Sequence, residues 1–166
     1  MNSFLKVCKE TLESTASVLF IVAAASIFAW TLTVEQLPQQ VSEALLSISH
    51  SPTMLLLFTN IILLIAGMFL ETTAAIMIFT PILLPTLLAA GVNPVHFGLV
   101  MVFNLMIGML TPPVGMSIYM LSPIAGLPVN KLFKAVVPYL IPLLVALIIL
   151  TYVPQISLWL PNLIYK

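Results

Sequence analysis

The sequence predicts an all-α integral membrane protein, and three observations lead to this class. Of the 166 residues, 61% are hydrophobic and only 6% are charged, whereas an average soluble domain carries about 25% charged residues. The apolar runs reach the roughly 20 residues that a helix needs to cross a bilayer core. Two runs are interrupted by helix-breaking and oxygen-bearing residues, which persist inside a membrane only when protein or a cavity surrounds them.

The charged residues exclude several classes of function. The chain has no Arg and no Asp, so it offers no basic face to nucleic acid and no Ser-His-Asp triad. It also lacks a glycine-rich phosphate loop, a metal-ligand cluster and paired carboxylates within the apolar runs. We therefore expect no enzymatic activity and no nucleic-acid partner. His50 and His96 fall near predicted membrane surfaces, and we interpret both as structural.

The first part of the chain predicts one crossing and one surface helix. Residues 1–15 predict a short interfacial helix that carries Lys6 and Lys9, and the charge-free residues 15–34 predict a first crossing. Residues 35–52 place apolar side chains at helical spacing between polar ones, which predicts an amphipathic interfacial helix. This segment has no Lys or Arg, so the positive-inside rule places it outside and the N-terminus in the cytoplasm.

Residues 53–90 contain the first interruption. As one straight helix they would be about 57 Å long, nearly twice the thickness of the bilayer core. The interruption, Gly67-Met-Phe-Leu-Glu71-Thr72-Thr73, falls near their middle. The chain therefore either turns back as a re-entrant hairpin with its tip at Glu71 or continues as a broken crossing helix.

Residues 95–125 contain the second interruption, Asn104-Leu-Met-Ile-Gly108-Met-Leu-Thr111-Pro112-Pro113-Val114-Gly115. Its adjacent prolines remove two amide donors and force the preceding residues out of helical geometry. Lys131 and Lys134 follow on the predicted cytoplasmic side, and residues 135–153 predict a last crossing. Residues 35–52 are placed outside and Lys131 and Lys134 inside, so residues 53–125 must cross the membrane an odd number of times. One interrupted segment is then a hairpin and the other crosses. Such paired breaks point to the ion and substrate site of a secondary transporter.

Several motifs together resemble one known family. They are Gly67-Met-Phe-Leu-Glu71-Thr-Thr-Ala-Ala-Ile, Thr80-Pro-Ile-Leu-Leu-Pro85, Asn93-Pro-Val-His-Phe-Gly98, the run from Asn104 to Gly115 and the ending Thr151-Tyr-Val-Pro-Gln-Ile-Ser-Leu-Trp-Leu-Pro161. Through them residues 1–166 resemble, as a single membrane domain, the large permease of tripartite ATP-independent periplasmic (TRAP) transporters. The resemblance covers only the C-terminal one of that permease's two inverted repeats. We therefore expect a fragment, a split-gene product or a truncated reading frame.

The resemblance implies half of an inverted-repeat transporter with three crossings, a re-entrant hairpin over 53–90 and a broken crossing helix over 95–125. It implies sodium-coupled, elevator-like import of an organic anion, a C4-dicarboxylate or a sialic-acid-like carboxylate, across the bacterial inner membrane. The implied partners are the missing N-terminal repeat, a small membrane subunit, a periplasmic solute-binding protein and the lipid bilayer. The alternatives are a non-transporting assembly subunit, a truncated permease remnant and a pore built from several copies.

The candidate sodium ligands are Glu71, Gly108, Thr111 and Val114. Sodium prefers oxygen ligands, and the prolines keep nearby carbonyls out of helical hydrogen bonds. Glu71 is the only acid in the apolar middle of the chain, where a carboxylate costs at least about 2.5–3.5 kcal/mol unless it faces a cavity or a cation. The resembled family usually has an aspartate at this position. Proton coupling, or a hydrogen bond within a helix bundle, is the alternative role of Glu71.

The candidate substrate-binding residues are Thr72, Thr73, Asn104 and Pro113, which lie in the two interruptions. The alternative role of the threonine hydroxyls is to satisfy freed backbone groups. The alternative role of Asn104 is a hydrogen bond between helices. We expect no cofactor other than the coupling sodium ion.

Overall fold

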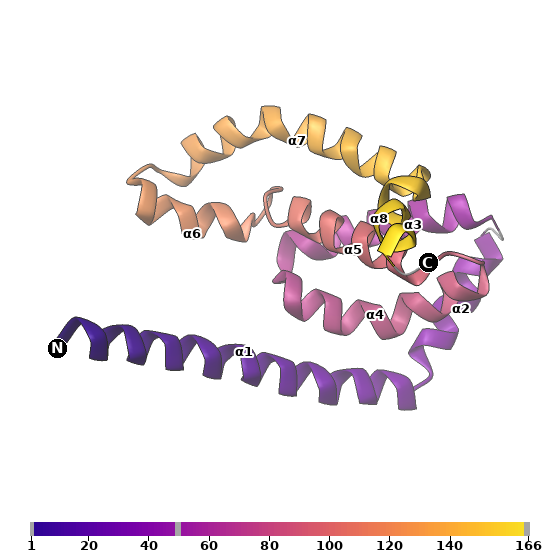
Figure 1. Ribbon diagram of the computed structural model, residues 1–166, viewed down its shortest axis with the longest axis horizontal. Coiled ribbons are helices and arrows are strands. Elements are labelled where there is room, and N and C mark those ends of the chain that lie inside the picture. Colours follow the sequence, from indigo (N-terminus) through magenta and orange to yellow (C-terminus); the bar gives the residue numbers. More distant parts are fainter. Residues whose placement is uncertain (1, 49–50, 165–166) are drawn as a thin grey trace.

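The computed structural model describes residues 2–48 and 51–164, and within them the regular structure is entirely helical. This confirms the predicted all-α class, while His50 lies outside the described residues. The helices, shown in Figure 1, are α1 (Asn2–Val34), α2 (Leu37–Ile48), α3 (Pro52–Phe69), α4 (Thr72–Ala89), α5 (Pro94–Gly108), α6 (Met116–Ala125), α7 (Val129–Tyr152) and α8 (Pro154–Ile164).

Three of the described helices, α3, α4 and α7, are long and apolar enough to cross a membrane, and α5 is a shorter apolar helix. The multi-pass character that the composition predicts is therefore supported. α7 contains the predicted last crossing, whereas α3 and α4 both lie in the segment predicted to form a re-entrant hairpin. The depth of each helix in a bilayer stays a prediction.

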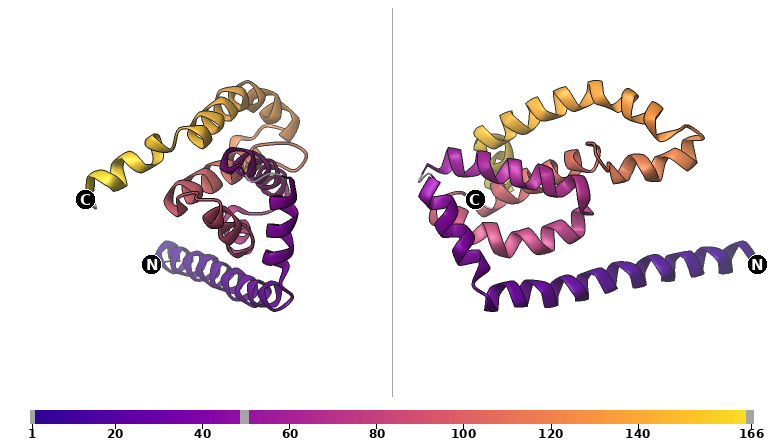
Figure 2. Two further views of the ribbon diagram at one scale, coloured as in Figure 1. Left: turned by 90° about the vertical axis from the view of Figure 1, so that its right-hand side faces the viewer. Right: turned by 180° about the vertical axis from the view of Figure 1, so that it is seen from behind.

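α1 is a single helix of 33 residues, although we expected an interfacial helix over residues 1–15 followed by a separate crossing. Neither Gly nor Pro, the two strongest helix breakers, occurs between Asn2 and Val34, which is consistent with this continuity. At 1.5 Å per residue, α1 is about 50 Å long. Its C-terminal part runs beside α4, and its N-terminal part extends beyond the other helices (Figures 1 and 2).

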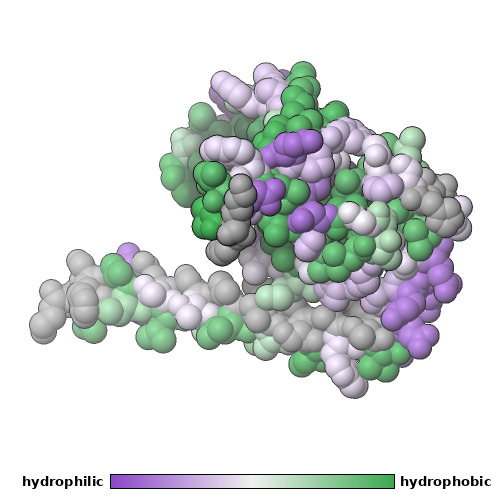
Figure 3. All heavy atoms as spheres, turned by 45° about the vertical axis from the view of Figure 1, so that its right-hand side comes forward, coloured by the Kyte–Doolittle hydropathy of each residue, from purple (hydrophilic) through white to green (hydrophobic). Residues whose placement is uncertain are grey.

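α2 is amphipathic, as its sequence predicts, and its apolar face packs on α4. Leu45 is buried, and Val41 and Leu46 join the same core cluster. The polar residues that follow α1 and open α2 are exposed, and Figure 3 shows hydrophilic side chains gathered over this part of the surface. Much of the remaining surface in that view is hydrophobic, as expected for a chain that meets lipid or other helices.

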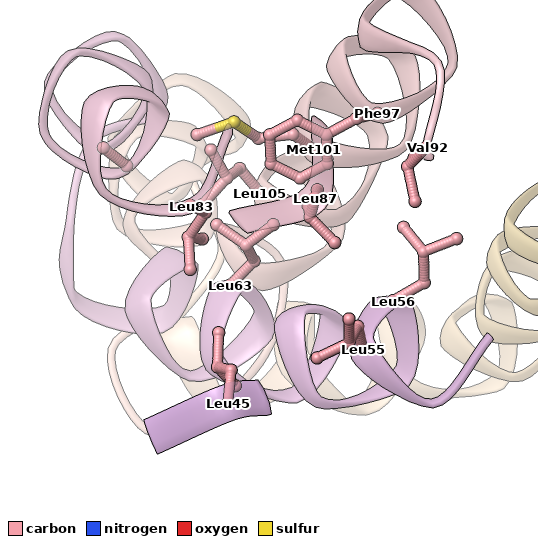
Figure 4. Close-up of a cluster of buried hydrophobic side chains, with 11 residues drawn as sticks. Leu45, Leu55, Leu56, Leu63, Leu83, Leu87, Val92, Phe97, Met101 and Leu105 are labelled. Carbon is pink, nitrogen blue, oxygen red and sulfur yellow. The ribbon is translucent and has the colours of Figure 1, made fainter. Parts of the chain in front are cut away.

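The main core lies between α2, α3, α4 and α5. α3 and α4 run antiparallel on either side of a turn at Leu70 and Glu71, and α5 returns parallel to α3 (Figure 1). Figure 4 shows the side chains of this core converging from the four helices. Its buried members are Leu45, Leu55, Leu56, Leu63, Ala75, Leu83, Leu87, Val92, Phe97, Met101 and Leu105.

α7 runs back along α5 after the second interruption, and a smaller cluster of Val100, Ile107, Leu140 and Leu147 holds the two helices together. α7 contains two prolines and arches in Figure 1, as helices with internal prolines do. α8 begins directly after α7 and contacts α5. The N-terminal part of α5 is thereby joined to α8, while its C-terminal end leads into the interruption.

Candidate functional site

The two interruptions predicted from the sequence lie side by side. α3 ends at Phe69 and α5 ends at Gly108, and these parallel helices touch through the backbones of Gly67 and Gly108. A Cβ atom added to Gly108 would lie 2.7 Å from the Cα atom of Gly67, and one added to Gly67 would lie 3.0 Å from the carbonyl oxygen of Leu105. Only glycine permits this approach, so these glycines set the distance between the two breaks.

Free backbone carbonyls gather at this shared end. The last carbonyls of a helix have no intrahelical partner, and at the end of α3 those of Gly67 to Leu70 accept no hydrogen bond from the described residues. The same holds for the carbonyls of Thr111 to Val114 after α5. Both helices also direct the negative ends of their dipoles to this side. The unpaired, partly negative oxygens of both segments therefore follow the C-terminal ends of two helices that touch.

Glu71 lies at the turn between α3 and α4 and caps α4. Its Oε2 atom accepts a hydrogen bond of 3.1 Å from the backbone amide of Ala74, and its Oε1 atom accepts one of 3.0 Å from Thr73 Oγ1. The carboxylate is thus stabilised by the N-terminus of α4, where negative charge is favoured. Each oxygen retains a further lone pair, because a carboxylate can accept about four bonds.

Thr72 connects the two interruptions. Its hydroxyl donates to Met109 Sδ at 2.7 Å, and Met106 Sδ lies 3.9 Å away. The hydroxyl of Thr73 instead donates to Glu71, the residue that caps its own helix. The structure therefore brings the predicted substrate residue Thr72 to the second break and keeps Thr73 beside Glu71.

The segment between α5 and α6 holds Thr111, Pro113 and Val114. Thr111 Oγ1 donates to the carbonyl of Ile107 at 2.8 Å, and the amide of Thr111 donates to the carbonyl of Gly108 at 2.9 Å. The carbonyl of Gly108, a predicted sodium ligand, is therefore already an acceptor. Pro113 is exposed, whereas Thr111 and Val114 are half-buried.

Gly115 ends this segment in the left-handed region, with φ of 59°, which favours glycine. A Cβ atom added there would lie 2.8 Å from the ring of Phe133 on α7. Two requirements, one of backbone conformation and one of space, therefore fix glycine at the start of α6.

Asn104 is fully buried between α3 and α5. Its Nδ2 atom donates to the backbone oxygen and to the Oδ1 atom of Asn60, both at 2.9 Å. Asn60 in turn donates to Thr151 Oγ1 on α7 at 2.8 Å. The structure thus gives Asn104 the helix–helix hydrogen bond that was its alternative role.

Sequence reasoning missed three partners in this region. Asn60 and Thr151 complete the buried network with Asn104, and their polarity within apolar helices was the available signal. Met109 was missed because nothing in a sequence distinguishes a methionine that accepts a hydrogen bond from one that packs. Three buried atoms, Thr59 Oγ1, Thr86 Oγ1 and Asn104 Oδ1, have no hydrogen-bond partner among the described residues.

Comparison with known proteins identifies the family. The model for the DctM component of tripartite ATP-independent periplasmic transporters matches residues 1–156. The sialic acid TRAP transporter large permease of Vibrio cholerae is 40% identical over 98% of this chain and 38% of its own length. The C4-dicarboxylate TRAP large permease of Pseudomonas aeruginosa is 45% identical over 95% of this chain and 37% of its own length.

The isethionate TRAP permease of Oleidesulfovibrio alaskensis is 41% identical over 95% of this chain and 25% of its own length. The chain therefore spans less than two fifths of the length of these curated relatives. These relatives are transporter permeases, which agrees with the expectation of a non-enzyme. The family match over residues 1–156, together with these relatives, shows that the chain belongs to the large permease family of TRAP transporters.

Proposed function

We propose that the chain forms the C-terminal part of a sodium-coupled secondary transporter that imports an organic anion across the bacterial inner membrane. The observation that carries the proposal is the contact of two broken helices at Gly67 and Gly108, with unpaired carbonyls on both sides. Half-helix C-termini and unwound carbonyls are the groups with which transporters bind coupling cations. Movement in this proposal is elevator-like, with the N-terminus of α1 in the cytoplasm.

The proposed sodium ligands are the carbonyls of Gly108, Thr111 and Val114, the hydroxyl oxygen of Thr111 and the carboxylate of Glu71. The carbonyls of Thr111 and Val114 are free of hydrogen bonds from the described residues, so binding a cation there breaks no existing bond. Glu71 supplies negative charge from the adjoining turn. Sodium would offset the cost of holding that charge at membrane depth.

The proposed anion contacts come from the opposite helix ends. α4 and α6 begin beside the breaks, and helix N-termini favour anions. Thr72, Thr73 and Pro113 lie at these starts or in the adjoining loop and are the proposed substrate groups. Asn104 is buried in hydrogen bonds to Asn60, so we assign it the role of holding α5 in place behind the site.

The partners and the substrate class are proposed from the relatives. Their names specify sialic acid, C4-dicarboxylates and isethionate, which all carry a carboxylate or a sulfonate. We propose a substrate of this anionic class, delivered by a periplasmic binding protein to an assembly with a small membrane subunit and the N-terminal repeat. The purified chain alone in liposomes should show no sodium-dependent uptake, because one half supplies one side of the pocket.

Cation binding is tested directly by the stability of the purified chain in lipid nanodiscs. A ligand that binds only the folded state raises the free energy of unfolding with its concentration. Sodium chloride should therefore raise the unfolding temperature more than potassium or choline chloride at the same ionic strength. In Glu71→Gln and in Thr111→Ala, the apparent affinity for sodium read from this increase should fall at least about tenfold, which corresponds to 1.4 kcal/mol.

Two control variants match these changes outside the site. Glu43→Gln removes an exposed acid on α2, and Thr31→Ala removes a hydroxyl that bonds a carbonyl four residues back, as that of Thr111 does. Both should keep the full sodium response. An equal response to potassium, or full sodium response in Glu71→Gln and Thr111→Ala, would remove these residues from the proposed site.

A further inference from the structure

The opposite end of α5 contains a second polar cluster, centred on His96. This side chain is 2% exposed and lies in the first turn of α5. Its Nδ1 atom lies 2.6 Å from Ser157 Oγ on α8, and its Nε2 atom lies 3.2 Å from the carbonyl oxygen of Thr151 on α7. One imidazole ring therefore joins α5 to the corner between α7 and α8.

The partners of the ring determine where its protons lie. The carbonyl of Thr151 can only accept, so Nε2 must carry a hydrogen. Ser157 Oγ can either donate or accept, and it has a second acceptor, the carbonyl of Pro154, at 2.8 Å. The hydroxyl hydrogen can therefore point to His96 Nδ1 or to Pro154.

Each orientation of the hydroxyl satisfies a different charge state of the ring. When Ser157 donates to Nδ1, His96 is neutral with its hydrogen on Nε2. When Ser157 donates to Pro154, its oxygen accepts from a protonated Nδ1, and the ring is a cation. Rotation of one hydroxyl thus lets the ring gain a proton with both nitrogens still hydrogen-bonded and no helix displaced.

Few titratable side chains surround the ring among the described residues. Of the helices that pack on α5, α3, α4 and α8 carry no titratable side chain among their described residues. On α7, Tyr152 lines the same pocket as His96, and Lys131, Lys134 and Tyr139 lie toward the other end.

His96 also lines that pocket. It has a volume of about 310 Å³, and its lining includes His96, Thr151, Asn93 and Thr53. It opens at the N-terminal ends of α3 and α5, away from the Gly67–Gly108 contact. We propose that His96 is a reversible proton-binding site, in which the Ser157 hydroxyl turns from His96 Nδ1 to the Pro154 carbonyl when a proton from pocket water binds Nδ1.

The test is nitrogen-15 NMR of the histidine-labelled chain in lipid nanodiscs, between about pH 5 and pH 8, where histidine changes charge. A His50→Gln background leaves one labelled ring. We expect Nε2 to carry a hydrogen throughout and Nδ1 to gain one as the pH falls. A ring with one hydrogen across the whole range, or one that loses the Nε2 hydrogen first, would overturn the proposal. Neither result depends on sodium binding or transport.

The Ser157→Ala variant tests the switching hydroxyl. Hydrogen bonds to charged groups are roughly twice as strong as neutral ones, so loss of the oxygen should weaken proton binding about tenfold and lower the titration midpoint. Ser47→Ala is the matched control, because Ser47 on α2 also bonds a carbonyl three residues back but lies far from His96 in the chain. An unchanged midpoint in Ser157→Ala would overturn the role of the hydroxyl. Should this variant not fold, the wild-type titration still decides.

Discussion

The two ends of the α3–α5 pair differ in how their polar groups are satisfied. At the N-terminal ends, Asn93 caps α5 with its side chain and both ring nitrogens of His96 have partners. At the C-terminal ends, the carbonyls of Gly67 to Leu70 and of Thr111 to Val114 have no partner among the described residues. The N-terminal end therefore joins the helices through satisfied polar groups, whereas the C-terminal end has carbonyl oxygens that accept no hydrogen bond from the described residues.

Gly108→Ala, at the C-terminal ends of the α3–α5 pair, should give the largest loss of stability. The new methyl group would meet the α3 backbone at 2.7 Å, and overpacking of this kind costs about 1–3 kcal/mol. We expect a loss near the upper limit because no flexible side chain can move away. The free energy of unfolding, measured by detergent titration in mixed micelles, checks this.

Gly98→Ala is the matched control for that loss. Gly98 lies in the same helix, and a Cβ atom added there meets nothing within 4 Å. Removing a helical glycine should therefore stabilise the chain by about 0.5–1 kcal/mol. Equal effects of the two substitutions would show that α3 and α5 do not approach at Gly67.

Asn60→Ala should weaken the hydrogen-bonded middle of the pair by about 1–2 kcal/mol, because it removes the side chain that joins Asn104 to Thr151. A double-mutant cycle with Asn104→Ala measures the direct coupling, for which we expect about 0.6–1.7 kcal/mol, the range of hydrogen bonds between membrane helices. Additive losses in the cycle would contradict the bond between the two amides.

Glu71→Ala should destabilise the chain by about 0.5–2 kcal/mol through loss of the cap on α4. Glu71→Asp should keep the stability, because the shorter side chain is a strongly preferred cap. The two roles of this residue then separate. If Glu71→Asp is stable and yet binds sodium differently, the carboxylate has a role beyond capping. Unfolding curves with and without sodium measure both the stability and its change with sodium.

Thr72→Val should have the smallest effect, about 0.5 kcal/mol or less. It removes the hydrogen bond to Met109 and keeps the shape of the side chain, and sulfur is a weak acceptor. Hydrogen exchange of the amides in the turn between α3 and α4 should rise slightly without a global change. A large loss of stability would mean that this contact, and not the glycine pair, joins the two breaks.

The sequence predicted the helical class and both interruptions because composition and helix breakers act locally. Its prediction of an interfacial helix over residues 1–15, apart from the crossing that follows, was wrong, because one helix continues from Asn2 to Val34 and neither Gly nor Pro interrupts it. The contact of Gly67 with Gly108 could not be predicted, because no local sequence pattern specifies which glycines meet. The sodium and substrate assignments stay predictions, and the two hydrogen bonds to the Glu71 carboxylate could not be read from residue types.

The backbone contact between Gly67 and Gly108 has a mechanical consequence. Where side chains separate two helices, changes of their rotamers let one helix slide along the other. No side chain separates α3 from α5 at this point, so a shift of one helix along the other would press neighbouring side chains against the facing backbone. Leu70 and Glu71, and residues 109–115, lie outside the helices, so these two joints, which border the unpaired carbonyls, are the places where torsion angles are not held by a regular helix. A ligand bound at those carbonyls would stiffen both joints at once.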